Sequence, residues 1–139
     1  MLNFETSLST VITKDEIVNL IKFANTKLQL NPTFQLKIFF VTKDDIQKLN
    51  LETRELNEPT DVLSFEDPEN EYHEIYLCSE VIKVNSSEFD VSFREELLRT
   101  ILHGYLHILG YDHEKSLNNE EEMFKVQEKV LTQYLSYEH

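Results

Sequence analysis

The stretch His103-Gly-Tyr-Leu-His107-Ile-Leu-Gly110-Tyr-Asp112-His113 holds three of the five histidines of this 139-residue chain and both of its glycines. Imidazole side chains bind protons and metal ions, whereas glycine lets the backbone bend. Their concentration in eleven consecutive positions indicates a functional site at the end of a helix rather than part of a hydrophobic core.

His103 and His107 are four residues apart, which places both side chains on one face of a helix, one turn from each other. Two imidazoles in that arrangement can bind one metal ion at the ~2.0–2.1 Å expected for zinc–nitrogen bonds. His113 lies beyond Gly110, where a straight helix would direct its side chain elsewhere. Because glycine readily adopts the left-handed conformation that ends helices, a bend at Gly110 can return His113 to the same ion.

Three neutral imidazoles suit zinc, and less exclusively copper or nickel. With three protein ligands, one zinc ion keeps a fourth position for water, as catalytic rather than structural sites do. A water bound there ionises near neutral pH and becomes a nucleophile. The alternative is three unrelated histidines, two exposed on a helix and one in a loop. Asp112 could orient a ligand histidine, cap a turn or act as a base, and the sequence does not choose among these roles.

The spacing His-x3-His-x2-Gly-x2-His is also that of metzincin proteases, in which the residue after the first histidine is the glutamate that acts as general base. Gly104 occupies that position here and cannot transfer protons. Met123, the downstream candidate for the methionine turn of those enzymes, falls within a predicted helix. We therefore expect a zincin-like metal-bearing helix without the base for peptide hydrolysis, and a metalloprotease is the weaker alternative.

Helix and strand signals in the rest of the chain indicate an α+β fold. Capping boxes at Thr13-Lys-Asp-Glu16 and Ser92-Phe-Arg-Glu95 begin two helices, and Gly110 ends the second. Together with apolar periodicity, they predict helices over 13–30, 42–53, 80–84, 92–109 and 119–135, and strands over 2–8, 34–40, 60–65 and 74–78. A short turn makes the last two strands antiparallel. We predict a single domain over residues 1–139, with a small mixed sheet of about four strands packed with about five helices.

The composition, 40% hydrophobic and 28% charged, is typical of a soluble globular protein. No apolar run approaches the ~18 residues of a membrane-spanning helix. The first residues lack the basic and apolar segments of a signal peptide. Cys78, the only cysteine, cannot form an internal disulfide, which fits a reducing cytosol. We expect a cytoplasmic protein that does not enter membranes.

The net charge of −13 disfavours non-specific attraction to nucleic acid, because phosphate binding normally depends on Lys and Arg. Nine carboxylates lie in residues 51–74, where Arg54 is the only Lys or Arg. A run of this kind is usually a solvated loop. Arg54 is then either a surface residue that pairs with Glu55 or Glu58, or a residue with a function of its own.

With these residues in view, the chain resembles the YbeY family of bacterial endoribonucleases, also called rRNA maturation factors. The family signature His-Gly-x-Leu-His-Leu-x-Gly-Tyr-Asp-His is matched over 103–113, with Ile108 in place of the second Leu. A second family stretch is an Arg followed six residues later by Thr-(Asp/Asn)-Val-Leu-Ser-Phe, matched by Arg54 and residues 60–65. The strand expected at 74–78 resembles the next strand of the family. The resemblance covers the chain from about Val41 to its end.

The resemblance implies a zinc-dependent endoribonuclease that cuts single-stranded RNA in 16S rRNA 3′-end maturation and in ribosome quality control. It implies one zinc ion on His103, His107 and His113, and a catalytic role for Arg54 beside the metal. It also implies rRNA, the small ribosomal subunit and its assembly proteins as partners. The physical chemistry agrees, because phosphodiester hydrolysis needs an activated water and a cation for the developing charge, and Arg grips phosphate with two hydrogen bonds. Arg54 and the strand at 60–65 should then form the wall opposite the histidines.

The chain departs from the family pattern at three places, none of them a proposed ligand. Asn57 stands where the family usually has Asp, Glu66 where it usually has Pro, and His73-Glu74 where it usually has Gly-Asp. The charge of −13 requires either that basic residues gather in the RNA-binding groove or that protein partners support binding. The acidic charge and the absent general base leave a second hypothesis, a non-enzymatic ribosome-assembly factor whose zinc braces the loop after Gly110.

Overall fold

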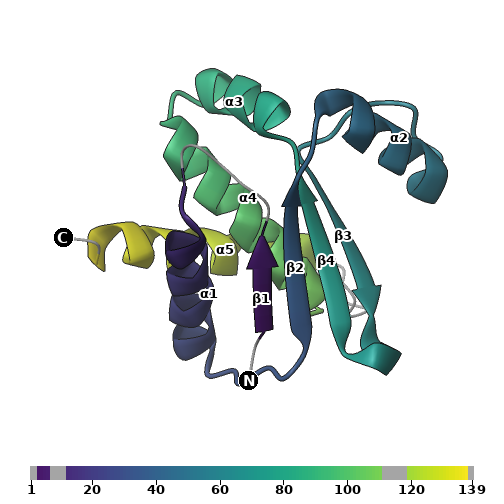
Figure 1. Cartoon of the computed structure of the whole chain (residues 1–139). Coiled ribbons are helices and arrows are strands. Elements are labelled where there is room, and N and C mark those ends of the chain that lie inside the picture. The colour runs from purple at the N-terminus through teal and green to yellow at the C-terminus, as the bar shows by residue number, and fades with distance from the viewer. Residues whose placement is uncertain (1–2, 7–11, 111–118, 138–139) are drawn as a thin grey trace.

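The computed structural model describes residues 3–6, 12–110 and 119–137 (Figure 1). The elements are β1 (Asn3–Thr6), α1 (Lys14–Leu28), β2 (Gln35–Phe40), α2 (Lys43–Arg54), β3 (Val62–Asp67), the 3-10 helix η1 (Pro68–Asn70), β4 (Tyr72–Leu77), α3 (Ser79–Glu88), α4 (Phe93–Ile108) and α5 (Asn119–Tyr137). They confirm the predicted α+β class. None of the described helices is long and apolar enough to cross a membrane.

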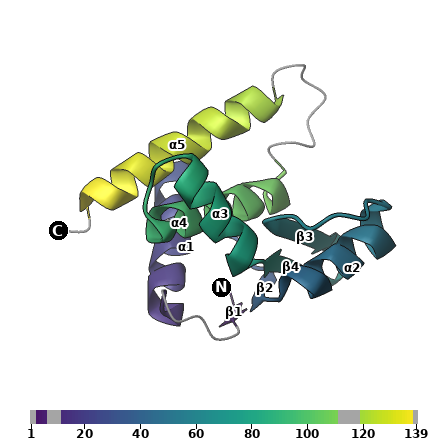
Figure 2. The ribbon, with the colours of Figure 1, turned by 90° about the horizontal axis from the view of Figure 1, so that it is seen from above.

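The described strands form a mixed sheet in the order β1-β2-β4-β3. β1 and β4 both pair with β2 in parallel, whereas β3 and β4 are antiparallel, as the short connection between them predicts. α4 packs across β3 and β4, and α1 and α5 pack on α4 (Figures 1 and 2). Seen from above in Figure 2, α4 therefore lies between α5 and the sheet.

N-caps are present at three helices: at Thr13 and Ser92, where the capping boxes predict them, and at Thr42, the first residue of the helix predicted over 42–53. Thr13 accepts a hydrogen bond from the Glu16 N–H at 3.1 Å, Thr42 one from the Asp45 N–H at 3.1 Å, and Ser92 one from the Glu95 N–H at 3.0 Å. The first capping box also predicts that the Glu16 side chain reaches back to Thr13, and this part of the prediction is wrong. The Glu16 carboxylate accepts from Arg94 of α4 (3.3 Å from Nε), so it joins α1 to α4 instead of reaching back to Thr13.

Several predicted boundaries of helices and strands are wrong by a few residues. One segment that was not predicted to be helical belongs to a helix. Residues 85–87 lie beyond the helix predicted over 80–84, but they continue α3 to Glu88. The Ser86 hydroxyl donates to the Lys83 carbonyl at 2.7 Å, so the serine is satisfied inside the helix, and its side chain is buried one turn beyond Ile82. The short turn expected between the last two strands contains η1. Of the strand expected at 2–8, residues 3–6 form β1, and the rest lies outside the described residues.

The core centres on α4, which is buried on several sides. Its buried residues include Leu97, Leu98, Ile101, Leu102 and Tyr105, because the helix is enclosed by the sheet, α1, α3 and α5. The Tyr105 hydroxyl donates to Asn25 Oδ1 of α1 at 2.5 Å. Burial raises the pKa of Tyr105 to about 12. α4 is therefore a rigid support for any site on its exposed edge.

His73 is a buried histidine on β4. Only 7% of its surface is exposed, its ring meets Phe34 edge-on at 4.7 Å, and its Nδ1 has no hydrogen-bond partner in the described part of the chain. Burial lowers the pKa of His73 from 6.5, against the opposing effect of the Glu66 and Asp67 charges. The neutral ring is therefore the form that suits the fold.

His73→Leu should weaken the acid sensitivity of the fold. As pH falls through 6.5, the unfolded chain protonates His73 while the folded chain keeps it neutral, so the free energy of unfolding decreases. Urea denaturation at about pH 7.5 and about pH 5.5, on either side of the unperturbed histidine pKa, should show a smaller loss in the variant than in the wild type. Effects of carboxylates common to both proteins cancel in this comparison, and equal losses would contradict the prediction.

Candidate functional site

His103 and His107 line one cleft with Arg54. The two imidazoles project from consecutive turns of α4, with ring centres 5.5 Å apart and planes inclined by 63°. The cleft has a volume of about 450 Å³, and its other lining residues are Val62, Leu63, Ser64, Phe65 and Glu66 of β3. This confirms the prediction that Arg54 and the strand near residues 60–65 face the histidines.

Arg54 is held at the cleft by β3. It is the last residue of α2, and its Nη2 donates to the Ser64 carbonyl at 2.9 Å. Its guanidinium carbon lies 5.6 Å from the centre of the Phe65 ring, within the range of a cation–π contact. Arg54 is exposed, but these contacts tie its guanidinium to β3 rather than to Glu55 or Glu58 and so favour a positioned arginine. In the described part of the chain one N–H is committed to Ser64, which leaves other guanidinium donors for an anion.

The helix α4 approaches β3 closely at Gly104. Ser64 Oγ donates to the Gly104 carbonyl at 3.2 Å. A Cβ atom at Gly104 would lie 3.2 Å from Val62 Cγ2, 3.3 Å from Ile75 Cγ2 and 3.3 Å from Ser64 Oγ. Position 104 therefore faces the sheet. The zincin-like prediction therefore holds only for the spacing of His103 and His107. A glutamate at 104 would point into the sheet and not into the cleft.

His103 has a partner on α5 that the sequence did not single out. Its Nδ1 lies 2.9 Å from Oε1 of Gln127, a residue that is only 4% exposed. The signal was available, since Gln127 is a polar residue on the face of α5 that also buries Met123 and Val130. The sequence pattern alone does not show which side chain of another helix Gln127 contacts.

The predicted bend after α4 begins as expected. The Leu109 N–H donates to the Tyr105 carbonyl at 3.0 Å, and the Gly110 N–H to the His107 carbonyl at 3.0 Å. Gly110 has φ +91°, a conformation that favours glycine. Asp112 and His113 lie outside the described residues, so the third ligand stays a prediction. No group of three His, Cys, Asp or Glu side chains suited to a metal occurs within residues 3–6, 12–110 and 119–137.

The chemistry of the two described histidines fits a metal. They lie one turn apart at the edge of a cleft, and the hydrogen bond at Nδ1 of His103 leaves its Nε2 for a ligand. Basic residues do not gather here, because Arg54 is the one Lys or Arg among the described lining residues, together with one carboxylate, Glu66. The described lining of the cleft therefore does not support the first explanation offered for RNA binding by an acidic chain, a basic groove.

The sequence matches the profile of a protein family described as Endoribonuclease YbeY over residues 3–135. The Endoribonuclease YbeY of Thermosipho melanesiensis is 38% identical over 111 residues, which are 79% of this chain and 80% of that protein. That of Staphylococcus epidermidis is 36% identical over 133 residues, 86% of this chain and 85% of that protein. That of Thermotoga neapolitana is 44% identical over 90 residues, but only 65% of this chain and 60% of that protein are aligned.

A similar fold has been solved. The solution structure of TM1509 from Thermotoga maritima is 32% identical in sequence and superposes with a TM-score of 0.65, covering 94% of this chain and 87% of that one. The family match begins at residue 3, so the similarity extends beyond the part from Val41 onward that the sequence motifs indicated.

Gly104→Glu should destabilise the fold strongly. The added side chain would push α4 away from Val62 and Ile75, and overpacking with a buried charge costs several kcal/mol. Thermal unfolding should show a large drop in Tm. Gly104→Ala, which adds only the Cβ, should cost less, because its tight contacts are offset by the ~1 kcal/mol of helix propensity that alanine gains over glycine. An unchanged Tm for Gly104→Glu would mean that position 104 does not face the sheet.

Proposed function

This chain belongs to the Endoribonuclease YbeY family, and we propose that it is an endoribonuclease that hydrolyses RNA phosphodiester bonds in rRNA processing. The observation that carries this function is the placement of Arg54 opposite His103 and His107 across one cleft. Phosphodiester hydrolysis requires charge neutralisation at phosphate and activation of water. This placement assigns the two tasks to opposite walls of the cleft.

The proposal includes one zinc ion held by His103, His107 and His113. Zinc in such a site supplies a coordinated water with a pKa near neutrality, which is a nucleophile toward phosphorus. The chain's own part is to present two imidazoles from a buried, rigid helix, so that the ligands need little reorganisation on binding. Gly104, next to His103, faces the sheet and lets the helix that carries both imidazoles pack closely against β3.

Arg54 acts on the phosphate. With its Nη2 bound to the Ser64 carbonyl and its plane near Phe65, the guanidinium is oriented before substrate arrives. It then donates to the non-bridging phosphate oxygens, on which negative charge accumulates as the water attacks. Phe65 lies beside it at the cleft and offers an aromatic surface for an unpaired base, which supports single-stranded RNA as the substrate.

We further propose that the substrate is the 3′ end of 16S rRNA, with a second role in ribosome quality control, and that the protein acts in the cytoplasm. With one Arg lining the described cleft and a net charge of −13, phosphate contacts alone give little affinity. The small ribosomal subunit and its assembly proteins would supply the remaining binding energy.

A second candidate function is a non-enzymatic ribosome-assembly factor whose zinc braces the chain after Gly110. The acidic charge favours it, and so does the absence of a general base at position 104, which faces the sheet. A metalloprotease has less support, since position 104 faces the sheet and cannot present a general base. A casein digestion assay tests that alternative directly.

Arg54→Glu and His107→Ala should each lower RNA cleavage by at least about 100-fold, because they remove the charge-neutralising donor and a metal ligand respectively. Cleavage of a single-stranded RNA by purified, zinc-loaded protein measures this. Lys48→Glu is a matched control for charge, since Lys48 is an exposed residue on the same helix as Arg54 and does not line the cleft. Cleavage at the wild-type rate by both site variants would overturn the assignment of these residues.

Zinc removal separates the two candidate functions. If the protein is an endoribonuclease, a chelator should abolish cleavage and added zinc should restore it, while metal analysis should find one zinc per chain that His113→Ala loses. If zinc only braces the fold, His113→Ala and chelation should lower Tm, and the intact protein should not cut RNA. Trace ribonuclease is controlled by carrying His107→Ala through the same purification.

A further inference from the structure

The residues behind His103 form a continuous polar chain from α4 to α5. We propose that Gln127 is a positioning residue that holds His103 in the tautomer with hydrogen on Nδ1, so that Nε2 presents its lone pair to the ion in the cleft. The inference rests on the proposed zinc site, but it concerns a property of the protein that is measurable without RNA.

The contact between the two residues is well placed. His103 Nδ1 and Gln127 Oε1 are 2.9 Å apart, a normal hydrogen-bond distance. Gln127 is 4% exposed, on the face of α5 that packs against α4. Water therefore competes little for this bond, and a buried amide without its partner would cost free energy.

The orientation of the Gln127 amide follows from its other partner. The Gln127 Nε2 lies 3.0 Å from Glu128 Oε2. An ionised carboxylate only accepts hydrogen bonds, so the amide NH2 must face Glu128 and the amide oxygen must face His103. A carbonyl oxygen also only accepts, and the ring nitrogen facing it must therefore be the N–H donor. The network thus selects the Nδ1–H tautomer by elimination.

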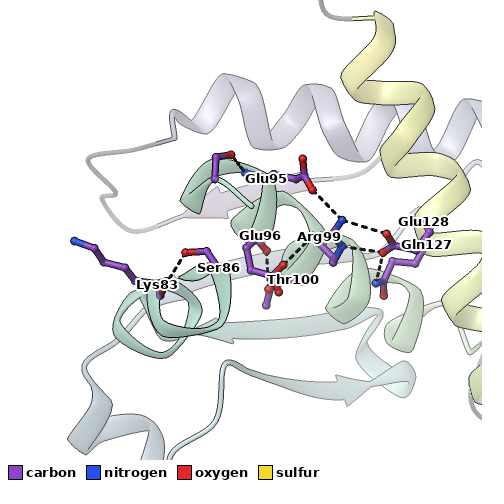
Figure 3. Close-up of polar contacts among 9 residues, drawn as sticks. Lys83, Ser86, Glu95, Glu96, Arg99, Thr100, Gln127 and Glu128 are labelled. Atoms are coloured by element: carbon purple, nitrogen blue, oxygen red, sulfur yellow. Dashed lines mark hydrogen bonds and ion pairs between the residues drawn. The ribbon is translucent and has the colours of Figure 1, made fainter. Parts of the chain in front are cut away.

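Arg99 of α4 holds Glu128 in place, as Figure 3 shows. Arg99 Nε donates to Glu128 Oε2 at 2.9 Å and Nη2 donates to Oε1 at 3.1 Å, a two-pronged contact with both carboxylate oxygens. Arg99 also donates to Glu96 at 2.8 Å and to Glu95 at 3.1 Å. Burial opposes the Arg99 charge, but the hydrogen bonds to Glu128, Glu96 and Glu95 outweigh it and raise the pKa of the guanidinium.

A neutral imidazole has one N–H and one lone pair, so fixing hydrogen at Nδ1 leaves the lone pair at Nε2. Metal-bound histidines in proteins usually donate their other N–H to such a partner, and losing the partner typically weakens metal affinity 10–100-fold. Gln127 fulfils that role here for His103, and the Arg99–Glu128 pair keeps Gln127 from turning.

The test is the tautomer of His103, read from the 15N and 1H shifts of its ring by NMR in the full-length protein above the histidine pKa. The metal-free wild type should show the Nδ1–H form. Gln127→Met, which keeps the length of the side chain but has no acceptor oxygen, should populate the Nε2–H form. Gln133→Met is the matched control, because Gln133 lies on the same helix and lines a pocket away from the cleft. It should leave the His103 signals unchanged.

Two further measurements keep the result decisive. If Gln127→Met does not fold by circular dichroism, Glu128→Leu replaces it, since freeing the amide NH2 lets Gln127 turn and should give mixed tautomers. If metal removal unfolds the chain, the zinc-loaded protein decides, because the Nδ1 proton of His103 should exchange slowly with solvent in the wild type and much faster in Gln127→Met, where it has no acceptor.

Zinc titration should show about tenfold or greater weakening for Gln127→Met and no change for Gln133→Met. An Nε2–H tautomer in the wild type, or an unchanged tautomer in Gln127→Met, would overturn the inference. The expected tautomers without any zinc binding would support the role of Gln127 in orienting the ring and would instead refute the proposed metal site.

Discussion

The close contact between α4 and β3 at Gly104 is the constraint on which the cleft depends. Because position 104 has no side chain, the helix backbone comes near enough for Ser64 Oγ to donate to the Gly104 carbonyl at 3.2 Å. His103 is directed toward the cleft from the adjacent position, and Arg54 is held by the carbonyl of the same Ser64. A larger residue at 104 would separate the two walls that carry the proposed chemistry.

Much of this arrangement could be predicted from the sequence because it depends on local signals. The caps at Thr13, Thr42 and Ser92, and the helix end at Gly110, each involve residues within about one helical turn of each other. The pairing of β3 with β4 follows from a short connection. The placement of Arg54 opposite the histidines is a long-range feature, and it was predicted from the resemblance to a family rather than from spacing.

The rest could not be predicted, because it depends on contacts between segments far apart in the chain. Gln127 is 24 residues from His103, and Arg99 is 29 from Glu128. A capping-box pattern suggested a local partner for Glu16, but Arg94, 78 residues away, offers a charged one. The extent of α3 likewise depends on burial of Ser86 against the core, which overrides the preference of serine for loops.

Two of the arginines form ion pairs that stabilise the fold, so their charges are not available in the cleft. Arg99 is committed to three carboxylates and Arg94 to Glu16, so both guanidinium groups join helices rather than face a substrate. Arg54 differs because its described hydrogen bond is to a backbone carbonyl, which satisfies a donor without neutralising the charge. A cation bound in this way keeps its charge for phosphate, with Glu66 as the one described carboxylate that lines the same cleft. A chain of net charge −13 repels nucleic acid on average. Under the proposed function, the choice of RNA substrate therefore depends on the position of the Arg54 charge rather than on the overall electrostatic potential of the protein.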